Sequence, residues 1–266
     1  MNLRELIDTV RDEGYSQANA EARVCQDIVL KAIVESAFAD HITVKGGVVM
    51  RSITGDTRRA TQDMDLDFIR YSLHDDSIRS FINRLNCLDG VAIQITGDIE
   101  ELSQQEYHGK RVFITIMDDT GYSLRSKIDL GVHKQVQIEQ DEYCFDVCMD
   151  DEGASLLINS KEQIFTEKLR SILRFGPLST RFKDVFDLCY LSDHVDRQRL
   201  EQCIKTYILS DPGMRETNID AVRTRVQQTF ADRTYRQRLE RSSSSNWMGI
   251  SVNDALERIS GFLKTL

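Results

Sequence analysis

The segment from Asp63 to Phe68 alternates acidic and apolar residues along its whole length. This period of two is typical of a β-strand, on which alternate side chains share one face. One face then carries the three aspartates, Asp63, Asp65 and Asp67, and the other carries Met64, Leu66 and Phe68. Adjacent carboxylates repel one another unless a cation lies between them, and oxygen ligands suit Mg²⁺ or Mn²⁺. The other interpretation is a solvated edge strand whose charges deter aggregation.

A pair of glycines, Gly46 and Gly47, lies upstream of this segment, between an expected strand and an expected helix. The β-branched run before Lys45 predicts the strand, and residues 48–53 are expected to form the helix. Backbone N–H groups at such a turn are able to bind phosphate oxygens, helped by the helix N-terminus. Most Gly-Gly pairs are only tight turns, so it is the position ahead of the acidic segment that makes this pair a candidate phosphate site.

A second strand-like segment, residues 127–132, places Lys127 and Asp129 on the face opposite its apolar side chains. Beside the acidic strand, Asp129 would supply a third carboxylate. Such a set would complete a two-metal site, in which paired ions activate a hydroxyl and stabilise a leaving phosphate. Taken alone, Asp129 is better interpreted as an ordinary solvated strand residue.

The character of the chain changes near residue 155. Residues 1–155 predict a mixed domain of strands and helices, and residues 156–266 predict a helical domain. The expected fold class is therefore α+β. No internal repeat is visible, and no run of apolar residues is long enough for a transmembrane helix.

Two expected helices in the second domain, over 160–175 and 180–193, contain unusually placed polar residues. Lys168 lies within the apolar stripe of the first helix, where a lysine either snorkels to the edge of the core or points into a cleft. Asp184 shares the side of the second helix that carries Leu188 and Leu191. Lys183 and Asp187 are expected to form an ordinary exposed pair four residues apart.

Together, these segments resemble a known family. The glycine pair, Asp63-x-Asp65 and a later Asp129 are similar to the nucleotidyltransferase superfamily that includes polymerase beta. More narrowly, KGGVVMRSITGDTRRATQDMDLDFI and IFTEKLRSILRFGPLSTRFKDVFDLCYL resemble two hallmarks of the AbiEii-type toxins of type IV toxin–antitoxin systems. Two departures stand out: Val48 occupies a usual Thr or Ser position, and Lys183 replaces the arginine before Asp184.

The resemblance implies a polymerase-beta-like mixed sheet with flanking helices, followed by a helical lobe that completes the nucleotide cleft. It implies transfer of a nucleoside monophosphate from an NTP to an RNA acceptor, with the tRNA 3′ end as the leading candidate, which would block charging and arrest growth. The implied catalytic residues are Asp63, Asp65, Asp129 and Lys168, of which the three aspartates are also the implied Mg²⁺ or Mn²⁺ ligands. The implied nucleotide-binding residues are Lys45, Gly46, Gly47, Arg59, Lys168 and Asp184. Asp67, Arg59 and Lys127 are expected to support them. A cognate antitoxin protein is the implied partner.

Charge and cysteine content constrain the setting. The formal net charge of −9 over 266 residues argues against a basic coat protein for nucleic acid but leaves room for a local basic groove. The arginine-rich run 223–241 is a candidate contact for RNA or an antitoxin. The N-terminus lacks the apolar core of a signal peptide, and the six cysteines show no zinc or disulfide spacing, so a cytoplasmic protein with reduced thiols is expected.

Three alternatives stay open at this stage. The acceptor could be a protein side chain or a small molecule instead of RNA. The chain could be a non-catalytic nucleotide-binding module, an interpretation that Val48 favours. Finally, the acidic segment could be a purely structural strand of an unrelated α/β protein, which would require all the motif matches to be accidental.

Overall fold

The computed structural model describes residues 1–102, 109–135 and 137–266. The chain divides into two compact units, residues 1–159 and 160–266. The sequence analysis placed the division between residues 155 and 156, a position that lies inside strand β8 (Asp150–Ile158). All six cysteines are free thiols.

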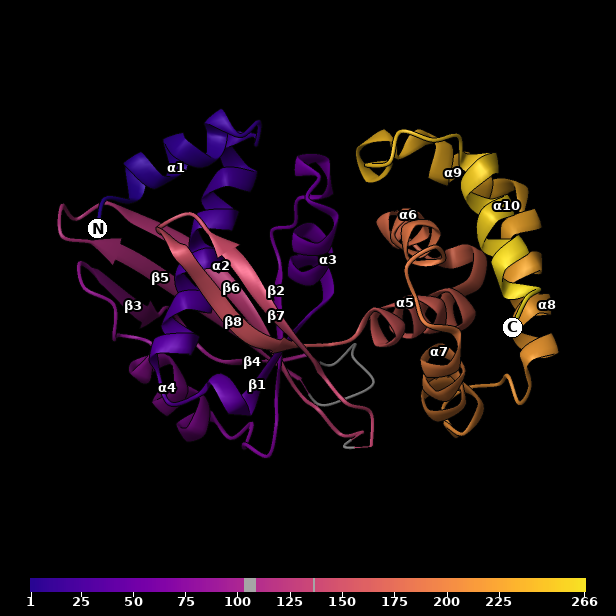
Figure 1. Ribbon diagram of the computed structural model, residues 1–266, viewed down its shortest axis with the longest axis horizontal. Helices are drawn as coiled ribbons and strands as arrows, with labels where there is room; N and C mark the ends of the chain where they lie inside the picture. Colours follow the sequence, from indigo (N-terminus) through magenta and orange to yellow (C-terminus); the bar gives the residue numbers. More distant parts are fainter. Residues whose placement is uncertain (103–108, 136) are drawn as a thin grey trace. The chain divides into compact units, whose positions relative to one another are not determined.

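In the described part of the first unit, eight strands form one mixed sheet in the order β3-β5-β6-β2-β1-β8-β7, with β4 pairing β5 (Figure 1). The strands other than β8 are β1 (Ile42–Lys45), β2 (Met64–Phe68), β3 (Val91–Ile95), β4 (Glu100–Leu102), β5 (Gly109–Asp118), β6 (Ser123–Val132) and β7 (Asp141–Val147). The pairs β1–β8 and β2–β6 are parallel and the others are antiparallel. The strand expected from the acidic alternation is confirmed as β2, which begins one residue after Asp63.

The apolar half of β2 anchors the acidic half. Met64, Leu66 and Phe68 are all buried, and Phe68 packs edge-on against the rings of Tyr71 and Phe81. Full burial of each such side chain stabilises the fold by about 1.5–3 kcal/mol. Because side chains alternate along a strand, this burial fixes which face carries the aspartates.

The helices of the first unit are α1 (Leu3–Asp12), α2 (Gln17–Glu35), α3 (Gly46–Thr54) and α4 (Asp75–Arg84), with short 3₁₀ turns η1 (Ala39–His41) and η2 (Thr57–Arg59). Helix α2 lies along the sheet in Figure 1 and contacts β6, β7 and β8. Nearly every residue of α2 from Ala20 to Ile33 is buried, including several charged ones. Its polar side chains therefore face other parts of the protein and not water.

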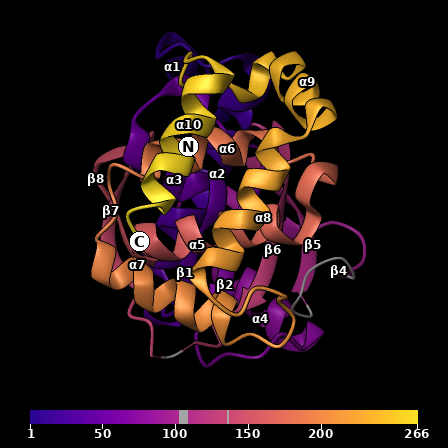
Figure 2. The ribbon, with the colours of Figure 1, turned by 90° about the vertical axis from the view of Figure 1, so that its right-hand side faces the viewer.

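The second unit is helical, with α5 (Lys161–Phe175), α6 (Phe182–Leu191), α7 (Arg197–Ile204), α8 (Ile219–Ala231), α9 (Arg233–Arg241) and α10 (Val252–Leu263). Its short turns are η3 (Gly176–Leu178), η4 (Lys205–Leu209, a π-turn) and η5 (Ser243–Ser245). Figures 1 and 2 show these helices from two directions; α5 contacts α6, α7 and α8, and α10 contacts α6, α8 and α9. None of the helices in the described ranges combines the length and apolar character needed to cross a bilayer.

Helix α5 begins at a fixed position because of a capping box. The Ser160 hydroxyl accepts from the Gln163 backbone N–H, and the Gln163 side-chain oxygen accepts from the Ser160 N–H. These reciprocal bonds satisfy amides that the first helical turn leaves unpaired. The cap thereby sets the phase of the helix and the direction in which Lys168 points two turns later.

Candidate active site

Strand pairing brings four charged residues into one row across the sheet. Lys45 on β1 pairs with Asp65 on β2, Asp65 pairs with Asp129 on β6, and Asp129 pairs with Arg111 on β5. Neighbouring strands lie about 4.8 Å apart, so these side chains are adjacent when they share a face. The sequence analysis expected Asp129 on a strand beside the acidic one, and the register pairs it with Asp65.

The glycine turn lies directly against this row. Gly46 starts α3 with φ +65°, a left-handed conformation that glycine adopts without strain. A Cβ on Gly46 would lie 2.4 Å from an Asp65 carboxylate oxygen, and one on Gly47 would lie 2.4 Å from the Thr61 hydroxyl. Both glycines are therefore required by close packing against the acidic segment, in addition to any role of their N–H groups.

Three carboxylates of the site each have a basic partner on a neighbouring strand. Lys127 Nζ lies 2.7 Å from Asp63 Oδ1, and Lys45 Nζ lies 2.7 Å from Asp67 Oδ1. Arg111 donates to both oxygens of Asp129, at 2.7 and 2.8 Å. This fork geometry is the strongest form of an ion pair between side chains. These pairs stabilise carboxylates that would otherwise repel one another.

Arg111 is a site residue that the sequence analysis missed. Its hydrogen bonds to Asp129, and then the charges of Asp129 and Asp63, raise its pKa above the usual arginine value despite partial burial. The only sequence signal is that the strand-like segment 110–117 places Arg111 on the face opposite Val112, Ile114 and Ile116, which does not indicate its partner.

A residue without a side chain makes room for the Lys45–Asp67 pair. A Cβ on Gly131 of β6 would lie 2.1 Å from Asp67 Oδ1 and 3.5 Å from Lys45 Nζ. Gly131 is the register partner of Asp67. The position therefore needs glycine for space.

The acidic residues have the right chemistry for a hard cation but are not gathered around one point. The described ranges contain no group of three or more Asp, Glu, His or Cys side chains arranged to hold a metal ion. Asp63 is exposed and Asp65 is half-buried, so both are accessible, whereas Asp129 is engaged on both oxygens by Arg111. The expected set Asp63, Asp65 and Asp129 thus supplies oxygen donors that suit Mg²⁺ or Mn²⁺. In this structure the oxygens of Asp129 bind Arg111.

Two other motif positions lie in the interior. Val48 is fully buried in α3, so its side chain packs in the core of the unit. Arg59, at the end of η2, is also buried. Thr61, whose hydroxyl approaches Gly47, belongs to the segment that carries the resemblance, but the sequence analysis assigned it no role.

In the second unit, Lys168 binds two buried carboxylates. Its Nζ lies 2.7 Å from Asp184 Oδ1 and 2.8 Å from Asp187 Oδ2, and the three side chains are 6%, 7% and 0% exposed. The expectation that Lys183 and Asp187 form an ordinary exposed pair is therefore wrong. Asp187 follows Asp184 by almost one helical turn, so both carboxylates of α6 reach the same lysine of α5.

Each carboxylate has a second partner that comes from outside α5. Arg181 Nε lies 2.6 Å from Asp184 Oδ2, and the indole N–H of Trp247 donates to Asp187 Oδ1 at 2.9 Å. Arg181 thus gives Asp184 an arginine partner, although Lys183 stands directly before Asp184 in the sequence. Sequence reasoning missed Trp247, because its position 60 residues from Asp187 gives no local signal.

Most arginines of the run 223–241 serve the structure of the second unit. Four of them donate to backbone carbonyls: Arg223 to Leu263, Arg225 to Leu173, Arg236 to Phe230, and Arg238 to Pro177 and Ser179. These bonds tie α8 and α9 to carbonyl groups elsewhere in the second unit. The run as a whole is therefore not a free basic surface.

Comparison with known proteins identifies the family. The family model described as nucleotidyl transferase AbiEii toxin, type IV TA system, matches residues 28–257. The chain belongs to this family. It is a nucleotidyltransferase of the AbiEii toxin group. The mixed sheet and helices described above have the α+β class that the resemblance implied.

A solved structure with a related description was also found. It is the crystal structure of an antigenic nucleotidyltransferase-like protein from Paracoccidioides brasiliensis, which is 15% identical, with a TM-score of 0.43. The match covers 67% of this chain and 87% of that one. No curated protein matched the chain.

Proposed function

We propose that this AbiEii protein is a metal-dependent toxin that transfers a nucleoside monophosphate from an NTP to the 3′ end of tRNA and thereby arrests translation. The observation that carries the proposal is the row in which Asp65 and Asp129 are register partners beside the Gly46 turn. A phosphate-binding turn and adjacent carboxylates are the two features that nucleotidyl transfer needs together. Such a toxin would act in the cytoplasm, and an antitoxin protein would inhibit it.

Asp63 and Asp65, with Asp129, are the residues proposed to hold Mg²⁺ or Mn²⁺. The bound metal supplies positive charge that offsets the phosphates and favours deprotonation of the acceptor hydroxyl. Each of the three bases that now pair with acids, Lys127, Lys45 and Arg111, has phosphate oxygens as an alternative partner. Release of Asp129 by Arg111 would give the triphosphate a bidentate donor and leave both oxygens of Asp129 accessible.

The nucleotide-binding set in the first unit centres on the turn. The N–H groups of Gly46 and Gly47 would donate to phosphate oxygens, with Lys45 supplying charge beside them. Arg59 is buried and lies four residues before Asp63 in the sequence. Its proposed role is therefore to support the acidic segment and not to contact base or ribose. The Thr61 hydroxyl next to Gly47 offers a replacement for the hydroxyl that Val48 lacks.

The second unit is proposed to complete the nucleotide cleft. Lys168 would neutralise charge on the triphosphate, which is an electrostatic contribution to the transition state. Asp184, shared between Lys168 and Arg181, would position base, ribose or acceptor. Asp187, which is fully buried, would hold Lys168 in place.

An RNA acceptor is supported by the distribution of charge. Residues 160–266 contain 18 of the 34 Lys and Arg but only 14 of the 43 Asp and Glu, so this unit is positive although the chain is acidic. Within it, three arginines (Arg174, Arg215 and Arg225) and one carboxylate (Glu216) line a cavity of about 170 Å³. Local positive charge of this kind is what a phosphodiester backbone requires.

The test is transfer of label from each α-³²P NTP, with Mg²⁺ or Mn²⁺, to total tRNA and to the protein alone. Label on tRNA that Asp65→Asn abolishes, and that the surface variant Asp8→Asn on α1 retains, supports the proposal. Label on protein only, or on an added small molecule, would instead favour another acceptor. NTP binding by calorimetry without transfer to any acceptor would contradict the enzymatic proposal and indicate a binding module.

A further inference from the structure

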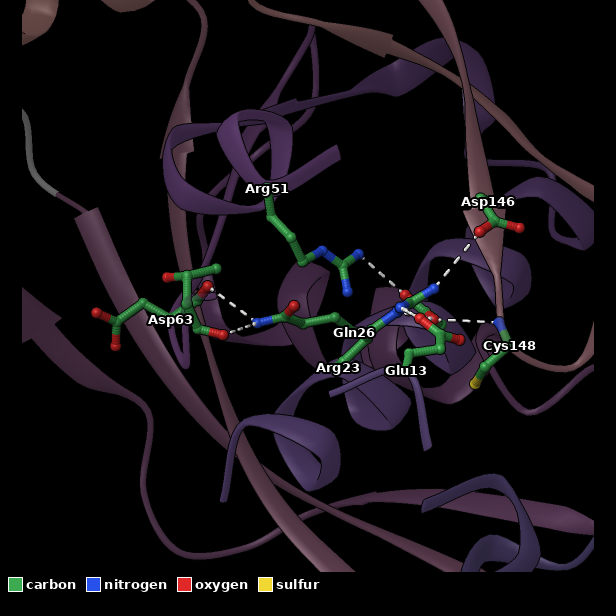
Figure 3. A network of polar contacts seen from close by, with 9 residues as sticks. Glu13, Arg23, Gln26, Arg51, Asp63, Asp146 and Cys148 are labelled. Carbon is green, nitrogen blue, oxygen red and sulfur yellow. Dashed lines mark hydrogen bonds and ion pairs between the residues drawn. The ribbon is translucent and has the colours of Figure 1, made fainter. Parts of the chain in front are cut away.

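Two consecutive residues of α2, Gln26 and Asp27, are buried and polar, and each reaches a different part of the candidate site (Figure 3). Their side chains are 1% and 0% exposed. They lie just before the part of the chain that the AbiEii family model matches, residues 28–257. None of the motifs discussed above includes them.

Gln26 holds the segment that enters the acidic strand. Its amide Nε2 donates to the backbone carbonyl of Thr61 at 3.0 Å and to that of Asp63 at 3.3 Å. Figure 3 shows the amide pointing toward this segment. These two carbonyls flank residue 62, immediately before β2 begins at Met64. The contact therefore fixes the backbone that carries Asp63 and leads directly to Asp65.

Asp27 holds the helix that starts at the glycine turn. Its Oδ1 accepts from Arg51 Nη2 at 3.0 Å, and Arg51 is itself buried near the end of α3. Its Oδ2 accepts from Arg23 at 3.3 Å and from the backbone N–H of Cys148 at 3.1 Å. Burial alone would lower the pKa of Arg23, but the carboxylates of Asp27 and Glu13 outweigh it and raise that pKa. Asp27 is thus a buried carboxyl group that accepts hydrogen bonds from Arg51, Arg23 and the Cys148 N–H.

The two anchored parts touch each other. Gly47, at the start of α3, approaches the side chain of Thr61 so closely that a Cβ would lie 2.4 Å from its hydroxyl. Gln26 binds the carbonyl of that same Thr61, and Asp27 binds Arg51 one turn further along α3. A single turn of α2 is thus the common support for the glycine turn and for the carboxylates that face it.

We propose that Gln26 and Asp27 are positioning residues that hold the Gly46-Gly47 turn at a fixed distance from Asp63 and Asp65 for nucleotidyl transfer. The side chains act on the site through the backbone carbonyls of Thr61 and Asp63 and through Arg51. The proposal rests on the function proposed above. Because a displacement of about 1 Å at a reacting group is able to lower a rate by about 100-fold, small losses of support have large effects on kcat.

The main test variant is Gln26→Met, which keeps the length of the side chain but donates no hydrogen bond. Its kcat for transfer should fall about 10- to 100-fold, with the KM for NTP changed by less than about threefold. Independently of activity, hydrogen–deuterium exchange of the amides in 61–65 should become at least about tenfold faster. Asp27→Asn should instead accelerate exchange in 46–51, since it weakens the contact to Arg51.

The matched control is Glu13→Gln. Glu13 pairs with Arg23, which also binds Asp27, and in the described part of the chain it forms no ion pair with α3 or the acidic segment (Figure 3). It should retain wild-type kcat and wild-type exchange in 46–51 and 61–65. Thermal unfolding of each variant distinguishes local loosening from loss of the fold.

Several results would overturn the proposal. Wild-type kcat and unchanged exchange at 61–65 in Gln26→Met would do so, as would an equal loss of kcat in Glu13→Gln. If Gln26→Met does not fold, the pattern of exchange in Asp27→Asn decides, and unchanged exchange at 46–51 counts against the proposal. If the wild-type protein transfers no nucleotide to any acceptor, the proposed function fails, and exchange alone then decides whether the two residues support the turn and the strand.

Discussion

The Lys168→Met substitution should lower the free energy of unfolding of the second unit by about 3–5 kcal/mol at pH 7, the usual cost of removing one partner from a buried ion pair. A cost of this size is expected because the single ammonium group of Lys168 binds two buried carboxylates, at 2.7 and 2.8 Å. Methionine retains most of the apolar stem, so the loss comes from charge and not from packing. Arg181 and Trp247 remain as second partners and keep the cost from rising further.

Urea unfolding followed by tryptophan fluorescence measures this change directly. Trp247 is the only tryptophan of the chain and its indole donates to Asp187, so the probe lies within the cluster. Adding Asp187→Asn to Lys168→Met should recover about 1–3 kcal/mol, because it removes one of the two buried carboxylates that lose the ammonium group.

Two results would refute this reasoning about the cluster. One is a change of less than about 1 kcal/mol in Lys168→Met, which would be the value of a solvated pair. The other is a double variant that is less stable than the single one, which would mean that Asp187 contributes mainly through Trp247.

Three further outcomes follow from the first unit. Gly46→Ala should reduce transfer about 100-fold, because the new Cβ displaces Asp65. The control is Gly97→Ala, at a position with positive φ and open space. It should lower the free energy of unfolding by only about 1 kcal/mol and retain activity. Arg111→Met should tighten Mn²⁺ binding in calorimetry while lowering transfer, since it frees a carboxylate from its guanidinium; weaker Mn²⁺ binding would contradict this. The pKa of Asp118 is lowered by hydrogen bonds from a neighbouring threonine hydroxyl and from backbone N–H groups, so the stability it contributes is present above its ordinary pKa and is lost as pH falls through the lowered value. Asp118→Asn should therefore flatten the acid-induced loss of circular dichroism below about pH 4, and an unchanged profile would refute that assignment.

The sequence predicted those features that depend on local periodicity. The alternation in Asp63–Phe68 predicted β2 and its buried face, and the glycine pair predicted the turn before α3. Both are properties of a few consecutive residues, for which side-chain direction follows from the backbone alone. The carboxylate Asp129 was found for the same reason, within the alternating segment that forms β6.

The helical wheel of α6 shows where local reasoning fails. It placed Asp184 on the apolar side and Asp187 on the exposed side, yet Asp187 is the more deeply buried of the two. A wheel assumes one buried stripe, whereas α6 is covered on several sides, and its polar residues are tolerated because α5 and Trp247 supply partners. No property of residues 180–193 alone indicates that a tryptophan 60 residues later donates to Asp187.

The pairing of acids with bases in the sheet has the same origin. Arg111 meets Asp129, and Lys127 lies beside Asp63, because β5, β6 and β2 adopt a particular register. A shift of one residue in either pairing would send these side chains to the opposite face and bury charges among the apolar residues. The apolar alternation of each strand therefore selects the register, and the register selects the ion pairs. The arrangement of charge in the candidate site is thus a consequence of how the core packs. This is why the sequence indicated the acidic residues of the site but not which base pairs with which acid.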